Sequence, residues 1–566
     1  MFEITLNPGF VLILAGFLIL ATPRVARAPL IVAAAIGALW LLLYHEFGAG
    51  AAVAQMGLPV VLLNLDALNR IFGIAMLIML IVLAVYSSAR RNRYEDAALL
   101  ILAGGAVSAL FVGDLVSFVA AAALTGLASA WIVFASPLDN AGAAGVRLLV
   151  WSGLEGLLFL VGVAFHLSTG AENSMFARLD AASLGGAFIF AALMIRVGAP
   201  LTHVWLNDGV AHASALGAVA LNIFTSMVGV YALARLFPAE PVLVYVGMGM
   251  MALGAAYAVA EDNLRAAGAY AMMAHTGVAV ALIGVGSPLA LAAAEGHAFA
   301  AIFAIGAWQM VLGGVLAKRG RVRVSEAAGL SRAMPVTAAL MLLAGLAAAA
   351  APGFALYASH AVALEASGQW PTRWVWLFIA ATSAGLFVAL GLRPALAAFI
   401  APEKPPVVSE APYTMLLGAA LGVFFCAAIG FAPNWLYGLM PANLTFEPYA
   451  LDRLAPHLEM LGAAGAVYIM LRAVGLTPRE RAVRLLDVDA FYRGPVAGAG
   501  RWVGVVMLRL HGAWQAGEAR GAKWAGELLE SLARRCDRPY RVGERGAFYL
   551  FLLGGAVIIA AVGMYL

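Results

Sequence analysis

Two charged side chains stand out because they lie inside apolar runs long enough to cross a membrane. Glu155 interrupts the run LVWSGLEGLLFLVGVAF, and Arg196 lies within the apolar segment 183–206. Arginine stays protonated, with a pKa above about 12, so Arg196 supplies a fixed charge and not a proton relay. An unpaired arginine at mid-membrane costs about 2.5–3.5 kcal/mol on insertion scales. We therefore predict a buried Glu155–Arg196 pair. The alternative is that Glu155 contacts a neighbouring subunit while Arg196 snorkels toward the interface or bonds carbonyls of the broken helix.

Histidines in apolar segments form a second set of titratable groups. Histidine titrates near neutral pH and can shuttle protons, although a histidine in an apolar helix is often a hydrogen-bonded structural residue. For His297 and His360, no second ligand lies at i+3 or i+4, so we predict no metal site. The set comprises His203, His212, His275, His297 and His360.

The elements that must hold these groups are membrane-spanning helices. The chain has 566 residues, of which 64% are hydrophobic and 11% charged. Its mean hydropathy is +0.93. This composition excludes a soluble, disordered or nucleic-acid-binding protein. The only lysines are Lys318, Lys404 and Lys523, and none lies inside an apolar run.

The remaining motifs point to no enzyme chemistry. Cys426 and Cys536 lie far apart and form no CxxC pair, which gives no support for a disulfide framework, an iron–sulfur site or haem attachment. No phosphate-binding glycine loop or Ser-His-Asp arrangement occurs either. We therefore expect no cofactor and identify no catalytic residues.

Apolar runs of about 20 residues predict an all-α polytopic membrane protein with roughly 16 transmembrane helices. Clusters of Arg and Lys between the runs fall on one side if the N-terminus is outside, and Arg235 is the one exception. This pattern predicts a bacterial-type inner or cytoplasmic membrane, with the basic tail in the cytoplasm. The crossings lie near 6–22, 29–47, 67–88, 96–112, 114–135, 147–168, 183–206, 213–236, 241–260, 266–286, 290–316, 334–366, 374–400, 412–437, 457–474 and 547–565.

Two of these crossings are expected to be broken. Gly198-Ala199-Pro200 and Ala351-Pro352-Gly353 each interrupt an apolar run. Broken helices at membrane depth expose backbone groups and commonly line ion or substrate sites, whereas a simple proline kink is the alternative.

The C-terminal part has a different composition. Residues 475–545 are basic, and Trp502, Trp514 and Trp524 are interleaved there with Arg and Lys. We predict an amphipathic segment on anionic lipids or on neighbouring subunits. The expected organisation is a transmembrane body over 1–474, a basic amphipathic tail over 475–545 and a final transmembrane helix over 546–566.

A series of local motifs resembles one known family. The motifs are LNLDALN at 63–69, GDLVSF at 113–118, HVWLND at 203–208, MVGVYALARL at 227–236, DNLRAAGAYAMMAHTG at 262–277, GHAFAAIF at 296–303 and PGFALYASH at 352–360. In this order and spacing they are similar to the antiporter-like proton-channel subunits of complex I and of Mrp-type Na⁺/H⁺ antiporters. DVDAFYR at 487–493 is similar to a segment of the Mrp D-like subunits.

The resemblance implies a relay of buried Glu, Lys and His, from which this chain departs. Ala123 stands at the position of a helix-five Glu, Met227 and Ala301 at positions of Lys, and Arg196 at the Lys of the broken seventh helix. His297 is retained, and His360 replaces the Lys or Glu of the twelfth helix. Arg265, Asp66, Asp114 and Asp208 match charged positions of the family, and the three aspartates are expected at helix ends.

Because no lysine lies inside a predicted transmembrane helix, a Lys-to-Lys proton relay cannot operate in this chain. We expect a membrane subunit of an Mrp-like or complex-I-like assembly that moves H⁺ or Na⁺ through a modified half-channel. The pathway would use Glu155, Arg196, His203, His275, His297 and His360. One alternative is a non-conducting scaffold. Another is an energy-coupling membrane subunit of an enzyme complex for inorganic carbon uptake or for a quinone- or hydrogenase-linked reaction.

Overall fold

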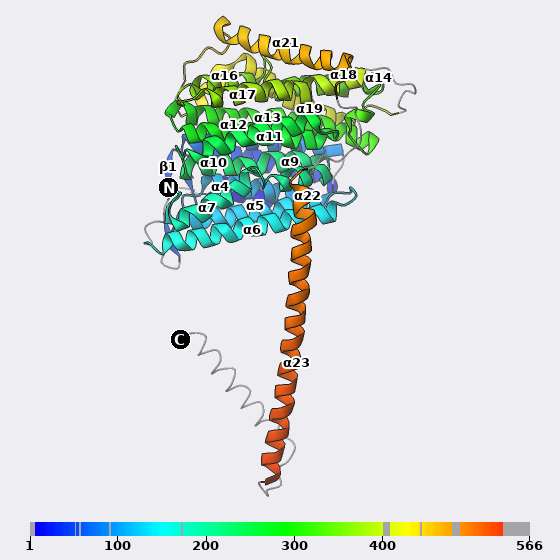
Figure 1. The fold of residues 1–566 in the computed structure, drawn as a ribbon. Coiled ribbons are helices and arrows are strands. Elements are labelled where there is room, and N and C mark those ends of the chain that lie inside the picture. Colours follow the sequence, from blue (N-terminus) through cyan, green and yellow to red (C-terminus); the bar gives the residue numbers. More distant parts are fainter. Residues whose placement is uncertain are drawn as a thin grey trace. The chain divides into compact units, whose positions relative to one another are not determined.

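The computed structural model describes residues 6–50, 52–55, 58–89, 92–170, 174–399, 408–441, 444–477 and 487–535. The chain divides into two compact units, 1–485 and 486–566. The first unit contains the buried charged residues. Its helices run side by side, with α21 and α6 at opposite edges in the view of Figure 1.

The N-terminal half of the first unit contains long helices and one small strand element. Antiparallel pairs β1–β4 and β2–β3 form a hairpin within 48–65 that precedes α3. Asp66 caps α3 through a reciprocal arrangement with Asn69. The elements are α1 (Pro8–Ile19), α2 (Arg24–Tyr44), β1 (Gly48–Ala49), β2 (Val53–Gln55), β3 (Leu58–Val60), β4 (Asn64–Leu65), α3 (Ala67–Tyr86), α4 (Arg93–Phe111), α5 (Leu115–Phe134), α6 (Ala141–Leu167), α7 (Leu184–Val197), α8 (Val204–His212), α9 (Ala215–Phe224) and α10 (Ser226–Leu236).

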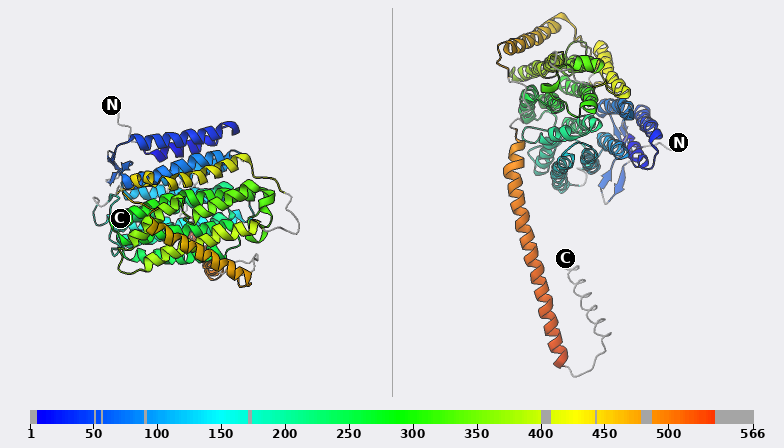
Figure 2. Two further views of the ribbon diagram at one scale, coloured as in Figure 1. Left: turned by 90° about the horizontal axis from the view of Figure 1, so that it is seen from above. Right: turned by 90° about the vertical axis from the view of Figure 1, so that its right-hand side faces the viewer.

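The second half of this unit continues in the same manner. Figure 2 shows its helices packed beside those of the first half. The longer elements are α11 (Val242–Ala260), α12 (Leu264–Val285), α13 (Pro288–Arg319), α15 (Pro335–Ala348), α16 (Ala355–Ser367), α17 (Trp374–Leu386), η4 (Phe387–Leu392, a π-helix), α18 (Arg393–Phe399), α19 (Tyr413–Phe431), α20 (Pro433–Leu439) and α21 (Leu451–Ala473). The short elements are η1 (Ser87–Ala89), η3 (Val324–Glu326) and α14 (Leu330–Ala333).

Both expected helix breaks are present. Helix α7 ends at Val197, and Gly198 and Leu201 take φ values of +70° and +76° before α8 begins. Helix α15 ends at Ala348, and Ala350 and Gly353 take φ values of +55° and +93° before α16 begins. Left-handed residues end a helix because the main-chain hydrogen-bond ladder cannot continue through them. The first interrupted run extends to His212, whereas the sequence placed its end at 206.

Loop contacts define two opposite faces of the first unit. On one, the hairpin face, Gly113 bonds Val61, Phe176 bonds Gly113 and Leu179 bonds Leu236. On the other, the basic face, Leu264 bonds Val322 and Lys318 bonds Ser409. The basic face also carries the first turn of α4, with Arg93. Successive helices connect these faces in alternation, as the predicted order of crossings requires.

Small residues allow neighbouring helices to approach closely. A Cβ on Gly247 of α11 would lie 2.5 Å from both the Gly277 oxygen and the Ala281 nitrogen of α12. Close approach of this kind is typical of membrane helices, where van der Waals packing replaces the hydrophobic effect.

Among its described residues, the second unit contains α22 (Asp489–Phe491), η5 (Tyr492–Val496, a π-helix) and α23 (Ala497–Arg535). Helix α23 spans 497–535 of the amphipathic tail predicted over 475–545, of which residues 478–486 and 536–545 lie outside the described part. Trp502, Trp514 and Trp524 are each more than 60% exposed within the described residues, so this helix presents apolar surface to a lipid or protein neighbour.

The fold class is confirmed as all-α polytopic, and the chain is an integral membrane protein. Among the described residues, 12 helices are long and apolar enough to cross a membrane, and Pro8–Ile19, Leu184–Val197 and Pro335–Ala348 are shorter apolar helices. The number of 16 crossings is not confirmed. The crossing predicted at 547–565 lies outside the described residues.

Candidate functional site

The predicted Glu155–Arg196 pairing is confirmed. Glu155 on α6 and Arg196 on α7 are 5% and 4% exposed, and the Arg196 Nε donates to the Glu155 carboxylate. A second guanidinium nitrogen, Nη2, donates to the Ala122 carbonyl of α5 at 2.8 Å. Helix α6 therefore supplies the acidic partner of Arg196. On α5, Ala123, the residue after Ala122, stands where the family resemblance implies Glu.

Arg196 occupies the last turn of α7, immediately before the first helix break. A cation is favoured there because the helix dipole places partial negative charge at the C-terminus. Gly229 of α10 gives the side chain room, since a Cβ at this position would lie 2.7 Å from Arg196 Cγ. A cavity of about 10 Å³, lined by both Glu155 and Arg196, adjoins the pair, which is close to the volume that one water molecule needs.

Histidines from four helices form a buried row beside the second helix break. His275 Nδ1 lies 3.1 Å from His297 Nε2. The ring centroids of His297 and His360 are 6.4 Å apart, and those of His360 and His457 are 5.2 Å apart. The four residues come from α12, α13, α16 and α21, and none is more than 5% exposed. We call them the histidine row.

The hydrogen-bond acceptors fix where the protons sit when His275 and His297 are both neutral. His275 Nε2 lies 2.9 Å from the Ala348 carbonyl, which only accepts, so this nitrogen carries hydrogen. His275 Nδ1 must then accept from His297 Nε2. His297 Nδ1 is left as an acceptor 3.3 Å from the Ser359 hydroxyl, whose single hydrogen also has the Leu356 carbonyl as an acceptor at 3.1 Å. When this pair binds one further proton, the donor and acceptor roles change in part of the hydrogen-bond series, as a proton relay requires.

The fourth histidine of the predicted pathway, His203, lies outside the histidine row. It precedes α8 at the first break, is 1% exposed, and its ring is 6.1 Å from that of Tyr270. His212, at the end of α8, lies 3.3 Å from Asp208. The structure thus brings together three of the four pathway histidines.

The family-matching charges hold the ends of the helices. Asp66 caps α3 and pairs with Arg235, so the arginine that contradicted the positive-inside pattern has an acidic partner on the hairpin face. Asp114 caps α5 and accepts from the Val61 main chain at 2.9 Å. The expected helix-end position of Asp208 is wrong, because this residue lies inside α8 and pairs with Arg147 at 2.7 Å.

Arg265, the second residue of α12, joins that helix to the gap between α8 and α9. Its Nη2 donates to the carbonyls of Ala213 and Ser214 at 2.5 and 3.0 Å. On the same face, burial raises the pKa of Glu261 above its usual range, while the Asn263 main-chain N–H donates to its carboxylate at 2.9 Å.

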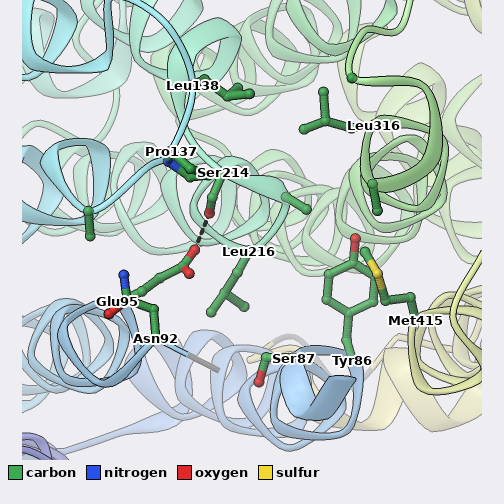
Figure 3. A pocket seen from close by; sticks show the side chains of 14 residues that line it. Tyr86, Ser87, Asn92, Glu95, Pro137, Leu138, Ser214, Leu216, Leu316 and Met415 are labelled. Atoms are coloured by element: carbon green, nitrogen blue, oxygen red, sulfur yellow. Dashed lines mark hydrogen bonds between the residues drawn. The ribbon is translucent and has the colours of Figure 1, made fainter. Parts of the chain in front are cut away.

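A pocket of about 530 Å³ opens next to this cluster. Figure 3 shows Glu95 of α4 beneath Ser214, whose hydroxyl donates to the Glu95 carboxylate. Tyr86 and Leu316 line the same pocket, so it lies at the basic face between the ends of α3 and α13. This arrangement leads from the basic face to a buried carboxylate.

Sequence reasoning missed several buried titratable residues, among them Glu95, Glu295 and His457. Glu95 and Glu295 are 8% and 4% exposed, and His457 is 5% exposed. Glu295 Oε2 has no hydrogen-bond partner among the described residues. An available signal existed for Glu295, which lies two residues before His297 in an alanine-rich run.

Comparison with known proteins shows that the middle of this chain is similar to one family. Residues 112–386 match the family described as NADH:quinone oxidoreductase/Mrp antiporter, TM. The chain is 30% identical to NAD(P)H-quinone oxidoreductase chain 4 1 of Synechococcus elongatus over 191 residues, covering 30% of this chain and 34% of that protein. It is 27% identical to the A/B component of a probable K(+)/H(+) antiporter of Rhizobium meliloti over 257 residues, covering 42% of this chain and 25% of that protein.

The fold extends the similarity to nearly the whole chain. A chain in the structure of the Mrp complex from Dietzia sp. DQ12-45-1b superposes with a TM-score of 0.72 at 20% identity, covering 99% of this chain and 63% of that one. The chain spans 34% and 25% of the lengths of the two curated relatives named above. The match of residues 112–386 to this family agrees with the resemblance that the sequence motifs carry.

Proposed function

We propose that this chain is a membrane subunit of an Mrp-like or complex-I-like assembly and carries protons or cations through a modified half-channel. One observation carries the proposal: the buried ion pair and the histidine row each lie at a helix break. Arg196 precedes the first break, and His275 and His457 bond the Ala348 and Ala350 carbonyls of the second. Buried polar groups at interrupted helices are typical of ion pathways.

Each part has a distinct role in this proposal. The Glu155–Arg196 pair is a fixed, internally neutralised element, since arginine does not release its proton. The histidine row takes over the relay that lysines would provide. The Glu95 pocket connects the basic face to the interior. Asp66, Asp114 and Arg265 hold helix ends that frame the pathway, and Asp208 joins α8 to α6 through Arg147.

The orientation and the surroundings belong to the same proposal. The N-terminus lies outside and the basic face is cytoplasmic, which follows the positive-inside rule. The transmembrane body over 1–474 packs against other membrane subunits. The basic tail over 475–545 binds anionic lipids in the cytoplasm, with the exposed tryptophans of α23 at the lipid interface.

A transport assay separates conduction from a scaffold role. The assembly is purified through a tag on this chain, its partners are identified, and it is reconstituted into vesicles that contain a pH-sensitive dye. Under an imposed potential, His360→Ala and Arg196→Ala should each lower proton uptake at least tenfold while the subunits remain assembled. Uptake equal to wild type in both variants, with intact assembly, contradicts the proposal and favours the scaffold.

The partner identification in the same experiment tests the third hypothesis. Co-purification of quinone-, hydrogenase- or inorganic-carbon-linked enzyme subunits would assign the chain to an enzyme complex. Co-purification of only antiporter subunits supports the Mrp-like assembly.

A further inference from the structure

His457 ends the histidine row and comes from a helix that no family-matching motif includes. It lies on α21, 5% exposed, with its ring 5.2 Å from His360 and 5.1 Å from Tyr357. Its Nε2 donates to the Ala350 carbonyl at 2.9 Å. The imidazole is therefore held by the second helix break while its ring faces His360.

A pocket of about 470 Å³ lies between α16, α17 and α21 and reaches both histidines. Glu365, Asp452 and Arg453 also line it, and Glu365 and Arg453 approach to 3.7 Å with side chains 54% and 34% exposed. These charges lie near the end of α16 and at the start of α21, so the pocket has a charged rim and an imidazole interior.

His360 supplies a second observation that points to a polar occupant. The residue is 2% exposed, and its Nε2 has no hydrogen-bond partner among the described residues. A buried imidazole nitrogen without a partner costs free energy unless water or another polar group satisfies it. The adjoining pocket is large enough for several water molecules.

We propose that this pocket is the aqueous opening of the ion pathway at the hairpin face and that His457 exchanges protons between bulk water and the histidine row. The inference rests on the proposed function. Because its Nε2–H stays bonded to the Ala350 carbonyl, His457 takes a proton from the pocket at Nδ1 and releases a proton from Nδ1 toward His360, so that no net proton is gained or lost. Ring separations of 5.2 and 6.4 Å along the row are within the reach of transfer through one water molecule.

Among the groups that surround His457, we assign the exchange of protons with bulk water to His457 itself. Tyr357 and His360 face it from α16, and Asp452 and Arg453 precede it on α21. Helix α17 contributes Trp376, Leu377 and three alanines, none of which titrates. Tyr449 reaches the site only through Tyr357, at a ring distance of 5.3 Å.

Proton uptake by the reconstituted assembly tests the role of His457. His457→Gln keeps an amide donor for the Ala350 carbonyl but cannot carry a proton, and it should lower uptake at least tenfold with unchanged thermal stability. His457→Glu restores a titratable group and should recover part of the rate. His166→Gln, at the end of α6, is the matched control. Uptake of His457→Gln equal to wild type overturns the role of His457, whereas absence of uptake by wild type overturns the proposed function itself.

Water accessibility tests the opening without relying on transport. With Cys426 and Cys536 replaced by Ala, Met460→Cys in the pocket should react with a membrane-impermeant thiol reagent applied to the hairpin face. Glu447→Cys in the preceding loop is the positive control, and Met470→Cys, 65% exposed on α21, is the lipid-facing negative control. A Met460→Cys rate equal to that of Met470→Cys shows a pocket filled by lipid and overturns the proposal.

A bulky side chain placed in the pocket provides a second functional variant. Ala384→Phe narrows the pocket from α17 without altering any histidine and should lower uptake. Ala428→Phe adds the same volume at an exposed position of α19 and should have no effect. Equal uptake in the two variants contradicts a pathway through this pocket.

Discussion

Removing Glu155 should destabilise the fold more than removing Arg196, although the two residues share one ion pair. In Glu155→Leu, Arg196 keeps only the Ala122 carbonyl as a partner, and its charge cannot be discharged. Loss of one partner from a buried pair costs about 3–5 kcal/mol, and the retained carbonyl favours the lower end. We expect about 3 kcal/mol, which is about a hundredfold in the unfolding equilibrium.

Arg196→Leu should cost less because the remaining carboxylate can bind a proton and become neutral. The expected loss is about 1–2 kcal/mol, the cost of an incompletely bonded buried polar group. The double variant Glu155→Leu with Arg196→Leu should unfold within about 1 kcal/mol of wild type, because neither charge remains. The double-mutant cycle therefore gives a strongly non-additive result.

Equilibrium unfolding in increasing SDS, followed by tryptophan fluorescence, measures these differences. Asp208→Asn is the control, because its partner Arg147 is 32% exposed and water can solvate the remaining charge. The reasoning is refuted if Arg196→Leu is as destabilising as Glu155→Leu, or if the double variant shows the sum of the single losses.

Three further variants test the surroundings of the pathway. Gly229→Val should cost about 1–3 kcal/mol by displacing Arg196, whereas Gly37→Val, with no atom near its Cβ position, should leave the thermal midpoint nearly unchanged. Asp66→Ala removes both a helix cap and the Arg235 partner, so it should lower the midpoint more than Asp66→Asn, which keeps the cap; equal losses would assign the effect to the ion pair alone. Burial raises the pKa of the Glu261 carboxyl, so the unfolded chain releases this proton at a lower pH than the folded protein does. The thermal midpoint of wild type should therefore fall relative to that of Glu261→Gln as pH rises through the raised pKa of Glu261. Thermal midpoints of the two proteins that run parallel between pH 4.5 and 8 would contradict this.

The sequence predicts the Glu155–Arg196 pair because an isolated charge in lipid is costly, and few carboxylates in the apolar runs are available to pair with Arg196. The same reasoning locates both helix breaks, where Pro and Gly interrupt apolar runs. It does not predict the histidine row. His457 lies 97 residues beyond His360, and only the packing of α21 against α16 and α17 brings the rings together.

The two glutamates that were missed illustrate another limit. Glu95 lies in the first turn of α4, near charged residues, and reads as an exposed helix end. It is buried because Ser214, from the junction of α8 and α9, covers and bonds its carboxylate. Burial of a residue at a helix end depends on which distant loop packs over it, and no local pattern records that contact.

The second helix break interrupts a helix, and its carbonyl groups also hold two histidines of the proposed proton pathway. Ala348 and Ala350, two residues apart, accept from Nε2 of His275 and of His457, the two ends of the histidine row. A carbonyl accepts and never donates, so neither imidazole passes a proton onward through that nitrogen. Transfer must instead use the Nδ1 side, toward His297 at one end and His360 at the other. Because both terminal imidazoles bond carbonyls of the same break, a change in the direction of these carbonyls would alter the hydrogen bonding of both ends of the row.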